Sequence, residues 1–274
     1  MAITTFDLAA AGARPPFRFA KSLSGTMVAG RPHSFWSMGG APGAGSFDTT
    51  LNGVTLSSTS ALVSGQIPHY DPASGNSNLL RMTARCTQPG VLTLLDRIWH
   101  NGGYTITSTS AQNSTTPTWP SRCPTSGIDD TPATTGIGVR LFLEVSAQTG
   151  SGTPTVTVTY TNTAGTNNRT ATNIIATVAN SIAGTTYEIG LQAGDVGVKS
   201  VESLQLSATW TSGTMNLVAA RVLAEIAITD NGAEIDWLTG GAARIYDGAV
   251  PYLMFTPSTT TTSTVFGTYQ ETQG

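Results

Sequence analysis

The sequence predicts a mainly β protein: an antiparallel β-sandwich or jelly roll with an extended N-terminal arm and one short helix. Between residues 137 and 229, apolar residues recur at every second position in several short runs. Turns rich in Gly, Asn, Ser and Thr join these runs, as in sandwiches and jelly rolls. The 274 residues include 30 Gly and 14 Pro together with many Ser and Thr, a composition that favours strands and turns.

Residues 1–45 are expected to form an extended arm. Pro15-Pro16 and Pro32 interrupt any helix and bias the residue before each toward extended backbone. Two interpretations are open: the segment packs across its own domain, or it lies on a neighbouring subunit. If it lies on a neighbour, deletion of residues 1–36 abolishes binding and leaves the sandwich folded. The candidate assembly anchors are its large apolar side chains, which lack helical spacing: Phe17, Phe19, Phe35 and Trp36.

Residues 46–136 read as a mixed segment with short strand-like runs over 47–63 and one helix at about 89–101. Pro89 is tolerated in a first helical turn, and Gly102-Gly103 supplies a helix stop. Between them the apolar side chains recur at i, i+3, i+4, i+7 and i+8. These residues are Val91, Leu92, Leu94, Leu95, Ile98 and Trp99.

Residues 137–255 are assigned to the β-sandwich domain. Within it, the segment 218–228 is ambiguous because its alanines suit a helix. Its β-branched residues and the preceding Ser-Gly-Thr turn favour a strand, which is our prediction. Residues 256–274 form a threonine-rich tail that we expect to be disordered or strand-like alone and able to extend a neighbour's sheet.

Formal charge is sparse. Charged residues make up 11% of the chain, against roughly 25% in ordinary soluble domains, and the net charge is −3. A folded monomer of this size exposes about 11,000 Å², so we expect partners to cover much of this weakly charged surface. The chain lacks the basic footprint of sequence-independent nucleic-acid binding and any apolar run long enough to span a membrane. We therefore expect no nucleic-acid partner and no membrane, and the N-terminus does not read as a secretory signal.

No pattern indicates a catalytic, cofactor or metal site. His33, His69 and His100 lack metal-ligand spacing, and no G-x-S-x-G motif presents a nucleophile. On the predicted helix, Asp96 and His100 would share a face, where either they form a surface ion pair or His100 lies beside the dipole of the helix end. Two cysteines, Cys86 and Cys123, are expected to be reduced and buried.

The acidic residues could form two kinds of site, a cation site or a pair of catalytic carboxylates. Asp129-Asp130, and Asp230-Asn231-Gly232 with Glu234 and Asp236, do not match a calcium loop, so turn chemistry explains them. A glycosidase would need two paired carboxylates at a separation that the sequence does not give. The candidates for such a pair are Glu144, Glu188 and Glu202.

Several phrases of the sequence resemble structural proteins of tailed-bacteriophage virions. The first is Leu94–Tyr104, which continues to Thr118-Trp119-Pro120. The others are Asn180–Thr185, Gly190–Asp195 and Ala208–Thr214. The resemblance implies a non-enzymatic virion part, assembled in the host cytoplasm, such as a capsid decoration (cement) protein, a minor head protein or a tail component.

Three hypotheses follow. The first is a capsid decoration protein whose partners are copies of itself, with a trimer favoured, and the major capsid protein. The second is a tail or host-recognition module, possibly carbohydrate-binding, with exposed aromatic residues at Trp119 and Trp210. The third is an enzyme such as a glycan depolymerase, which no constellation of residues supports. No cofactor is expected under the first two.

Overall fold

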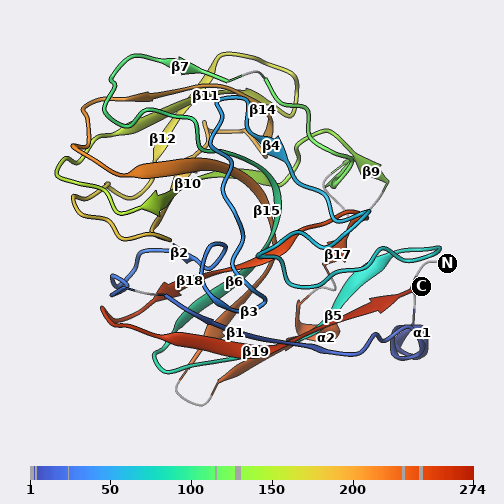
Figure 1. The fold of residues 1–274 in the computed structure, drawn as a ribbon. Coiled ribbons are helices and arrows are strands. Elements are labelled where there is room, and N and C mark those ends of the chain that lie inside the picture. Colours follow the sequence, from blue (N-terminus) through green and yellow to red (C-terminus); the bar gives the residue numbers. More distant parts are fainter. Residues whose placement is uncertain are drawn as a thin grey trace.

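A computed structural model describes residues 3, 5–23, 25–114, 116–126, 131–229, 232–240 and 243–274. The described chain is mainly antiparallel β structure in two large sheets of six and eleven strands. Two short helices, α1 (Phe6–Ala11) and α2 (Trp237–Gly240), accompany them (Figure 1). The predicted fold class is therefore confirmed. Neither described helix is long and apolar enough to cross a membrane.

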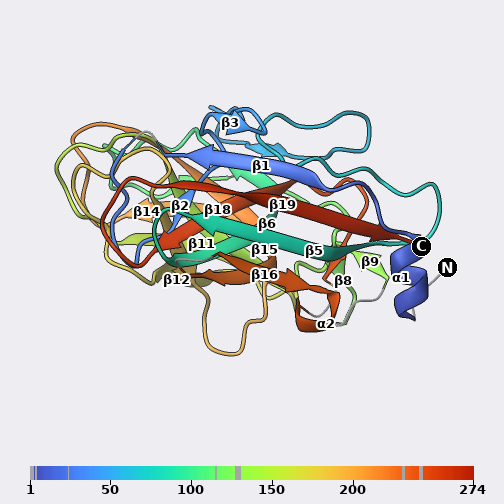
Figure 2. The ribbon, with the colours of Figure 1, turned by 90° about the horizontal axis from the view of Figure 1, so that it is seen from below.

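The six-stranded sheet brings together the two ends of the chain. Its central strand, β19, is C-terminal and lies between β5 and the N-terminal strand β1, with every pairing antiparallel. Figure 2 shows these strands side by side. The strand order is β16 (Ala233–Asp236), β5 (Ser77–Cys86), β19 (Thr264–Gln273), β1 (Phe17–Ser22) and β3 (Gly40–Ala41), and β17 (Arg244–Ile245) also pairs with β5.

The eleven-stranded sheet curls through most of the molecule. A separate two-stranded sheet pairs β8 (Cys123–Pro124) with β9 (Pro132–Ala133). In the large sheet, β4 (Val54–Thr55) pairs with β6 off the main path. The main order is β2 (His33–Ser34), β18 (Pro251–Pro257), β6 (Gly90–Asn101), β15 (Thr214–Ile228), β10 (Val139–Ala147), β13 (Thr186–Gly190), β12 (Arg169–Asn173), β11 (Val156–Asn162), β14 (Val198–Leu206) and β7 (Gln112–Asn113).

Two long neighbouring strands, β6 and β15, connect the two halves of the molecule. They pair from Leu217 opposite Asn101 to Ile228 opposite Gly90. At one end they border a core closed by β10 to β14, which we call the upper lobe. At the other end they pack, with β18, against the six-stranded sheet to form a sandwich, which we call the lower lobe. Figure 1 shows both strands running between the lobes.

The helix predicted at 89–101 is wrong, because this segment is strand β6. Ten consecutive residues from Leu92 to Asn101 are buried, so both faces of the strand are covered. Leu92 and Leu94 enter the lower core, whereas Ile98 and Trp99 enter the upper core. A strand buried on both faces has a continuous apolar run, which also satisfies helical spacing by chance.

Two other strand predictions agree with the structure, whereas the strand-like runs expected over 47–63 are reduced to the two residues of β4. The run from Ile137 corresponds to β10, and the ambiguous segment 218–228 is strand, as predicted, within β15. The threonine-rich tail includes strand β19, which is the centre of the chain's own six-stranded sheet. The total exposed surface of 11,085 Å² agrees with the value expected for a monomer of this mass.

Candidate functional site

Three of the four candidate anchors lie inside the chain's own core. Phe19 and Phe35 are 2% and 1% exposed and pack in the lower lobe. Trp36 is 1% exposed, and its indole N–H donates to the Ser46 carbonyl oxygen at 2.8 Å. Phe17 is half-buried, with its ring centroid 6.1 Å from that of Tyr70. The segment therefore packs across its own domain, the first of the two interpretations left open above.

The two tryptophans assigned to a carbohydrate site are also buried, so that assignment is wrong. Trp119 and Trp210 are 2% and 0% exposed and belong to the upper core. Trp119 donates its indole N–H to the Val198 carbonyl oxygen at 2.6 Å, and Trp210 donates to the Val178 carbonyl oxygen at 3.4 Å. Each ring thus anchors a loop to the core, a common role for a buried tryptophan.

A buried ion pair joins β6 to β10. Arg97, fully buried, donates from Nη1 to Glu144 Oε2 at 2.6 Å and from Nε to His100 Nδ1 at 3.1 Å. Its guanidinium carbon lies 4.6 Å from the Trp36 ring centroid and 5.2 Å from that of Tyr252. Burial, together with the charge of Arg97, lowers the pKa of His100 to about 2, so the imidazole is neutral and accepts this hydrogen bond.

Asp96 and His100 do not pair, because a strand rises about 3.3 Å per residue and separates positions four apart by about 13 Å. Asp96 instead accepts from the Val250 backbone N–H at 2.9 Å and lies 3.4 Å from Arg122 Nε. Arg122 also donates to the Arg97 carbonyl oxygen at 3.0 Å and to the Gly248 carbonyl oxygen. These contacts fix the loop before β18 to the middle of β6.

His69 links an internal loop to the C-terminal strand. Its Nδ1 lies 2.8 Å from Glu271 Oε1, and its Nε2 lies 3.2 Å from Asp71 Oδ1. Burial alone would lower the pKa of His69, but the hydrogen bond to Glu271 and the charges of Glu271, Asp71 and Asp96 raise it overall. Tyr269 also donates its hydroxyl to Glu271. All these groups hold the loop against β19 and leave no open space for a substrate at the imidazole, which is 1% exposed.

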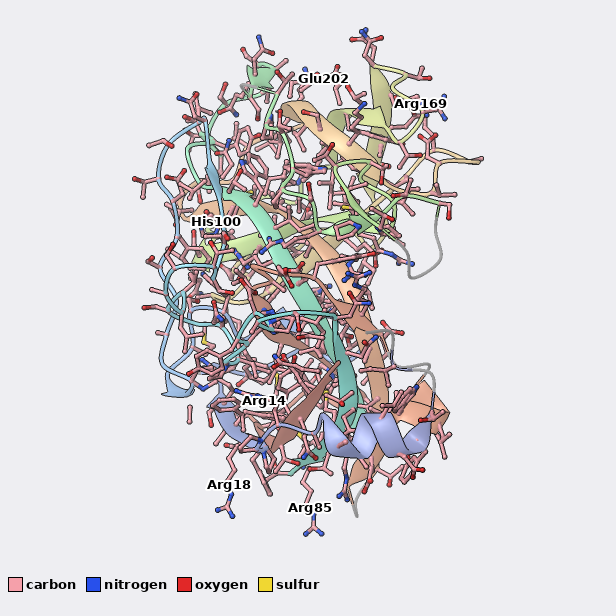
Figure 3. All side chains as sticks on the ribbon, turned by 90° about the vertical axis from the view of Figure 1, so that its right-hand side faces the viewer. Arg14, Arg18, Arg85, His100, Arg169 and Glu202 are labelled. Carbon is pink, nitrogen blue, oxygen red and sulfur yellow. The ribbon has the colours of Figure 1, made fainter. Side chains whose placement is uncertain are left out.

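The acids weighed as a glycosidase pair have separate partners. Glu144 pairs with Arg97, and Glu188 pairs with Arg140 at 2.8 Å. Glu202 accepts from the Thr161 hydroxyl at 2.7 Å and from the Asn168 backbone N–H at 3.2 Å. Figure 3 shows Glu202 at the opposite end of the molecule from Arg18 and Arg85. Glu144 and Glu188 lie on the neighbouring strands β10 and β13, and each is held in an ion pair of its own.

The described part of the chain contains neither a cluster of metal ligands nor a disulfide. There, no group of three or more His, Cys, Asp and Glu could hold a metal ion. Asp129-Asp130 and Asp230-Asn231 lie outside the described residues. Cys86 and Cys123 are both free, Cys86 half-buried and Cys123 buried, and burial raises the pKa of the Cys123 thiol to about 11.

The outer face of the six-stranded sheet combines exposed arginine side chains with one exposed aromatic ring. We call it the arginine face and define it by Arg18, Arg81, Arg85, Glu234 and Phe266. It forms a shallow groove of about 880 Å³ across β1, β19, β5 and β16. The strand register places Phe266 opposite Arg85, and Thr268 opposite both Arg18 and Thr83.

The charges of the arginine face are only partly neutralised. Arg81 pairs with Glu234, with Nε 2.6 Å from Oε1. Within the described part of the chain, the guanidinium groups of Arg18 and Arg85 have no ion-pair or hydrogen-bond partner. Both point away from the body of the protein in Figure 3. Phe266 is 43% exposed between them.

Sequence reasoning missed this face. Its signal was present but weak: arginines at 81 and 85 alternate with Met82 and Ala84, and Arg18 precedes Phe19 in the same way. Such alternation predicts a half-buried strand. The pairing of β1 with the last strand, which places Arg18 opposite Thr268 on the same face as Phe266, is a contact between distant parts of the chain that no local pattern indicates.

Comparisons with known proteins add little. No family model matches the chain, and no curated protein matches it. Among solved structures, the chain is similar to the infectious bursal disease virus VP2 subviral particle, with 10% identity and a TM-score of 0.19 over 96% of this chain and 81% of that one. Another is the infectious bursal disease virus Gt strain, with 12% identity and a TM-score of 0.18 over 94% and 81%. Scores this low carry no argument about fold or function.

Proposed function

We propose that the chain is a structural subunit of a virus particle, specifically a capsid-associated decoration protein of a tailed bacteriophage. The proposal rests on one observation, the small number of charged side chains on the folded surface. Of 29 charged side chains, six are buried, which leaves at most 23 on 11,085 Å². The buried six are Lys21, Asp96, Arg97, Arg122, Glu144 and Glu271.

A surface with so few charges is expected to be covered in its working state. Three large apolar side chains at the lower lobe support this expectation. Phe6 is 69% exposed, Leu238 is 82% exposed, and Phe266 is 43% exposed. Phe6 and Leu238 line one groove of about 380 Å³ that shares Arg81 and Glu234 with the arginine face. Exposed apolar residues on a broad face are typical of subunit contacts.

The internal construction suits a mechanical role. The strands β6 and β15 belong to both lobes, and the ion pair of Arg97 with Glu144 joins β6 to β10. A subunit that reinforces a shell must transmit force across its whole length without opening. The continuous strands provide this, and several contacts with neighbours would multiply the affinity.

A tail or host-recognition component is the alternative. The two residues expected to bind carbohydrate in that role, Trp119 and Trp210, are buried and cannot contact a ligand at the surface. Both roles place the chain in the particle and differ only in where it is bound.

Particle fractionation tests the proposal. Particles of the virus that encodes this sequence would be separated into heads and tails, and the chain quantified in each by mass spectrometry. We expect it in the head fraction, with release by mild denaturant before the shell opens. Recovery only with tails would support the alternative, and absence from both fractions would overturn a virion role.

A further inference from the structure

The loop of residues 68–76, which we call the latch loop, contacts two separate elements of the lower lobe. At the C-terminal end of β19, Gln273 donates from Nε2 to the Tyr70 carbonyl oxygen at 2.6 Å. In the loop before β18, the Gly248 N–H donates to Asp71 Oδ1 at 2.6 Å. The latch loop therefore joins the last strand of the chain to the loop before β18.

A buried imidazole of the latch loop lies between two carboxylates. His69 Nδ1 lies 2.8 Å from Glu271 Oε1, and His69 Nε2 lies 3.2 Å from Asp71 Oδ1. A neutral imidazole has one N–H and one bare nitrogen. Whichever nitrogen carries the single proton, the other directs its lone pair at a carboxylate oxygen. The charged imidazolium, with an N–H on each side, therefore fits this position better than either neutral tautomer.

Four carboxylates and two guanidinium groups surround this imidazole. The acids, from β19, the latch loop, β6 and the loop before β18, are Glu271, Asp71, Asp96 and Asp247. The guanidinium groups are those of Arg122 and Arg244. The Tyr269 hydroxyl donates to Glu271 and stays neutral, because burial raises its pKa. Burial disfavours a charge on His69, but the surrounding acids outweigh it and raise the pKa of the imidazole.

We propose that His69 acts as a pH-sensitive latch: its charged form holds the latch loop on both β19 and the loop before β18, and its neutral form releases the latch loop from the loop before β18. The contact that breaks is the one with Asp71, whose side chain is 25% exposed and can turn to water. It is also the longer contact, and Nε2 is not aligned for a hydrogen bond there. Glu271, in contrast, is buried and is held by Tyr269.

A rise in pH drives the release. The charged imidazole stabilises the closed latch below the unfolded pKa of about 6.5, and this contribution is lost as the pH rises through the higher folded pKa of His69. Burial and the charge of Asp71 raise the pKa of Asp247, so like charges are crowded at this contact. Once the imidazolium charge is gone, repulsion between Asp71 and Asp247 favours separation. The latch is a property of the lower lobe and does not depend on the proposed role in a virus particle.

Hydrogen exchange of one backbone amide measures the latch directly. The Gly248 N–H donates to Asp71, so it is protected while the latch is closed. We expect its protection, corrected for the intrinsic exchange rate at each pH, to fall by about tenfold or more between about pH 6 and pH 9. The amide of Leu143, paired on both sides in the middle of β10, should keep its protection over the same range.

Two variants make different predictions for this amide. Asp71→Asn keeps an oxygen for the Gly248 N–H and offers an N–H to a neutral His69, so protection should be high at both pH values. His69→Gln removes the titrating group, so protection should be low at both. The matched control is His33→Gln, at a buried histidine that accepts from a backbone N–H, and it should keep the wild-type pH dependence. Circular dichroism confirms that each variant is folded.

Three results would overturn the inference. They are a wild-type Gly248 amide with the same protection at both pH values, a pH dependence that survives His69→Gln, and a loss of protection at high pH that survives Asp71→Asn. If His69→Gln does not fold, the wild-type chain and Asp71→Asn still decide the question. None of these results changes where the chain is found in particle fractions, so failure here is separate from failure of the proposed function.

Discussion

At the scale of single residues, the buried pair of Arg97 and Glu144 is a costly contact to break. Arg97→Met leaves a carboxylate that is 1% exposed without its partner. We expect a loss of about 3–5 kcal/mol in the free energy of unfolding, measured by urea denaturation. The double variant Arg97→Met/Glu144→Leu should recover much of this loss, because it removes both charges. A single variant as stable as the wild type would contradict this description of the core.

The neutral histidine beside Arg97 predicts a loss of stability in acid. Burial and the charge of Arg97 lower the pKa of His100 to about 2, whereas an unfolded histidine titrates near 6.5. The unfolded state therefore gains a proton first as the pH falls below 6.5, and His100 should cost about 2 kcal/mol of stability between pH 7 and pH 5. His33, with a pKa lowered to about 4 by burial and by Arg31, acts in the same direction.

The variant His100→Gln measures this contribution. It should be less stable than the wild type at pH 7, but its stability should fall less between pH 7 and pH 5. His69 opposes the trend, because its pKa is raised and its contribution is present below pH 6.5 and lost as the pH rises through the folded value. An unchanged pH dependence in His100→Gln would contradict the assignment of a neutral, buried imidazole.

At the scale of elements, a strand could be predicted from the sequence where apolar and polar residues alternate along it. The strand β11 has buried Val156, Val158 and Tyr160 at alternate positions, and its alternation was readable from the sequence. The strand β6 is buried on both faces between Leu92 and Asn101, so its sequence shows no alternation and resembles a helix. The pairing of β1 with β19 joins the two ends of the chain and was not predictable from either segment alone.

The first strand is part of the lower lobe, which changes the expectation for truncation. Deletion of residues 1–36 removes β1 together with Phe19, Phe35 and Trp36 from the core. We expect this truncation to unfold the lower lobe, whereas deletion of residues 1–13, which removes α1, should leave the sheet intact. Thermal unfolding followed by circular dichroism measures both. A 1–36 truncation with the melting temperature of the full chain would show that β1 is dispensable.

At the scale of the whole molecule, the shared strands predict one cooperative unfolding transition. Leu94→Ala changes only the lower core, where it should cost about 2–5 kcal/mol. The tryptophans at 99, 119 and 210 report on the upper core. Since β6 passes through both cores, their fluorescence transition in urea should shift as far as the circular dichroism transition. A fluorescence transition that stays in place would show two independent lobes.

For the candidate site, the sequence predicted a weakly charged surface but not where the exposed face lies. Sparse charge was readable from composition and led to the expectation of a covered surface. The position of the exposed face could not be predicted from the sequence. Aromatic residues chosen as surface anchors, such as Trp36, are instead buried in the core. Phe266, in the threonine-rich tail, gave no local indication that its neighbours are Arg18 and Arg85.

The mass of the purified chain in solution tests the central claim most directly. Light scattering at low salt, over a wide range of protein concentration, should give a mass that is a multiple of 28.3 kDa and that falls toward 28.3 kDa as salt is added. That result would show that the weakly charged surface is covered by copies of the same chain. A mass of 28.3 kDa at every concentration and salt level would contradict self-assembly through this surface.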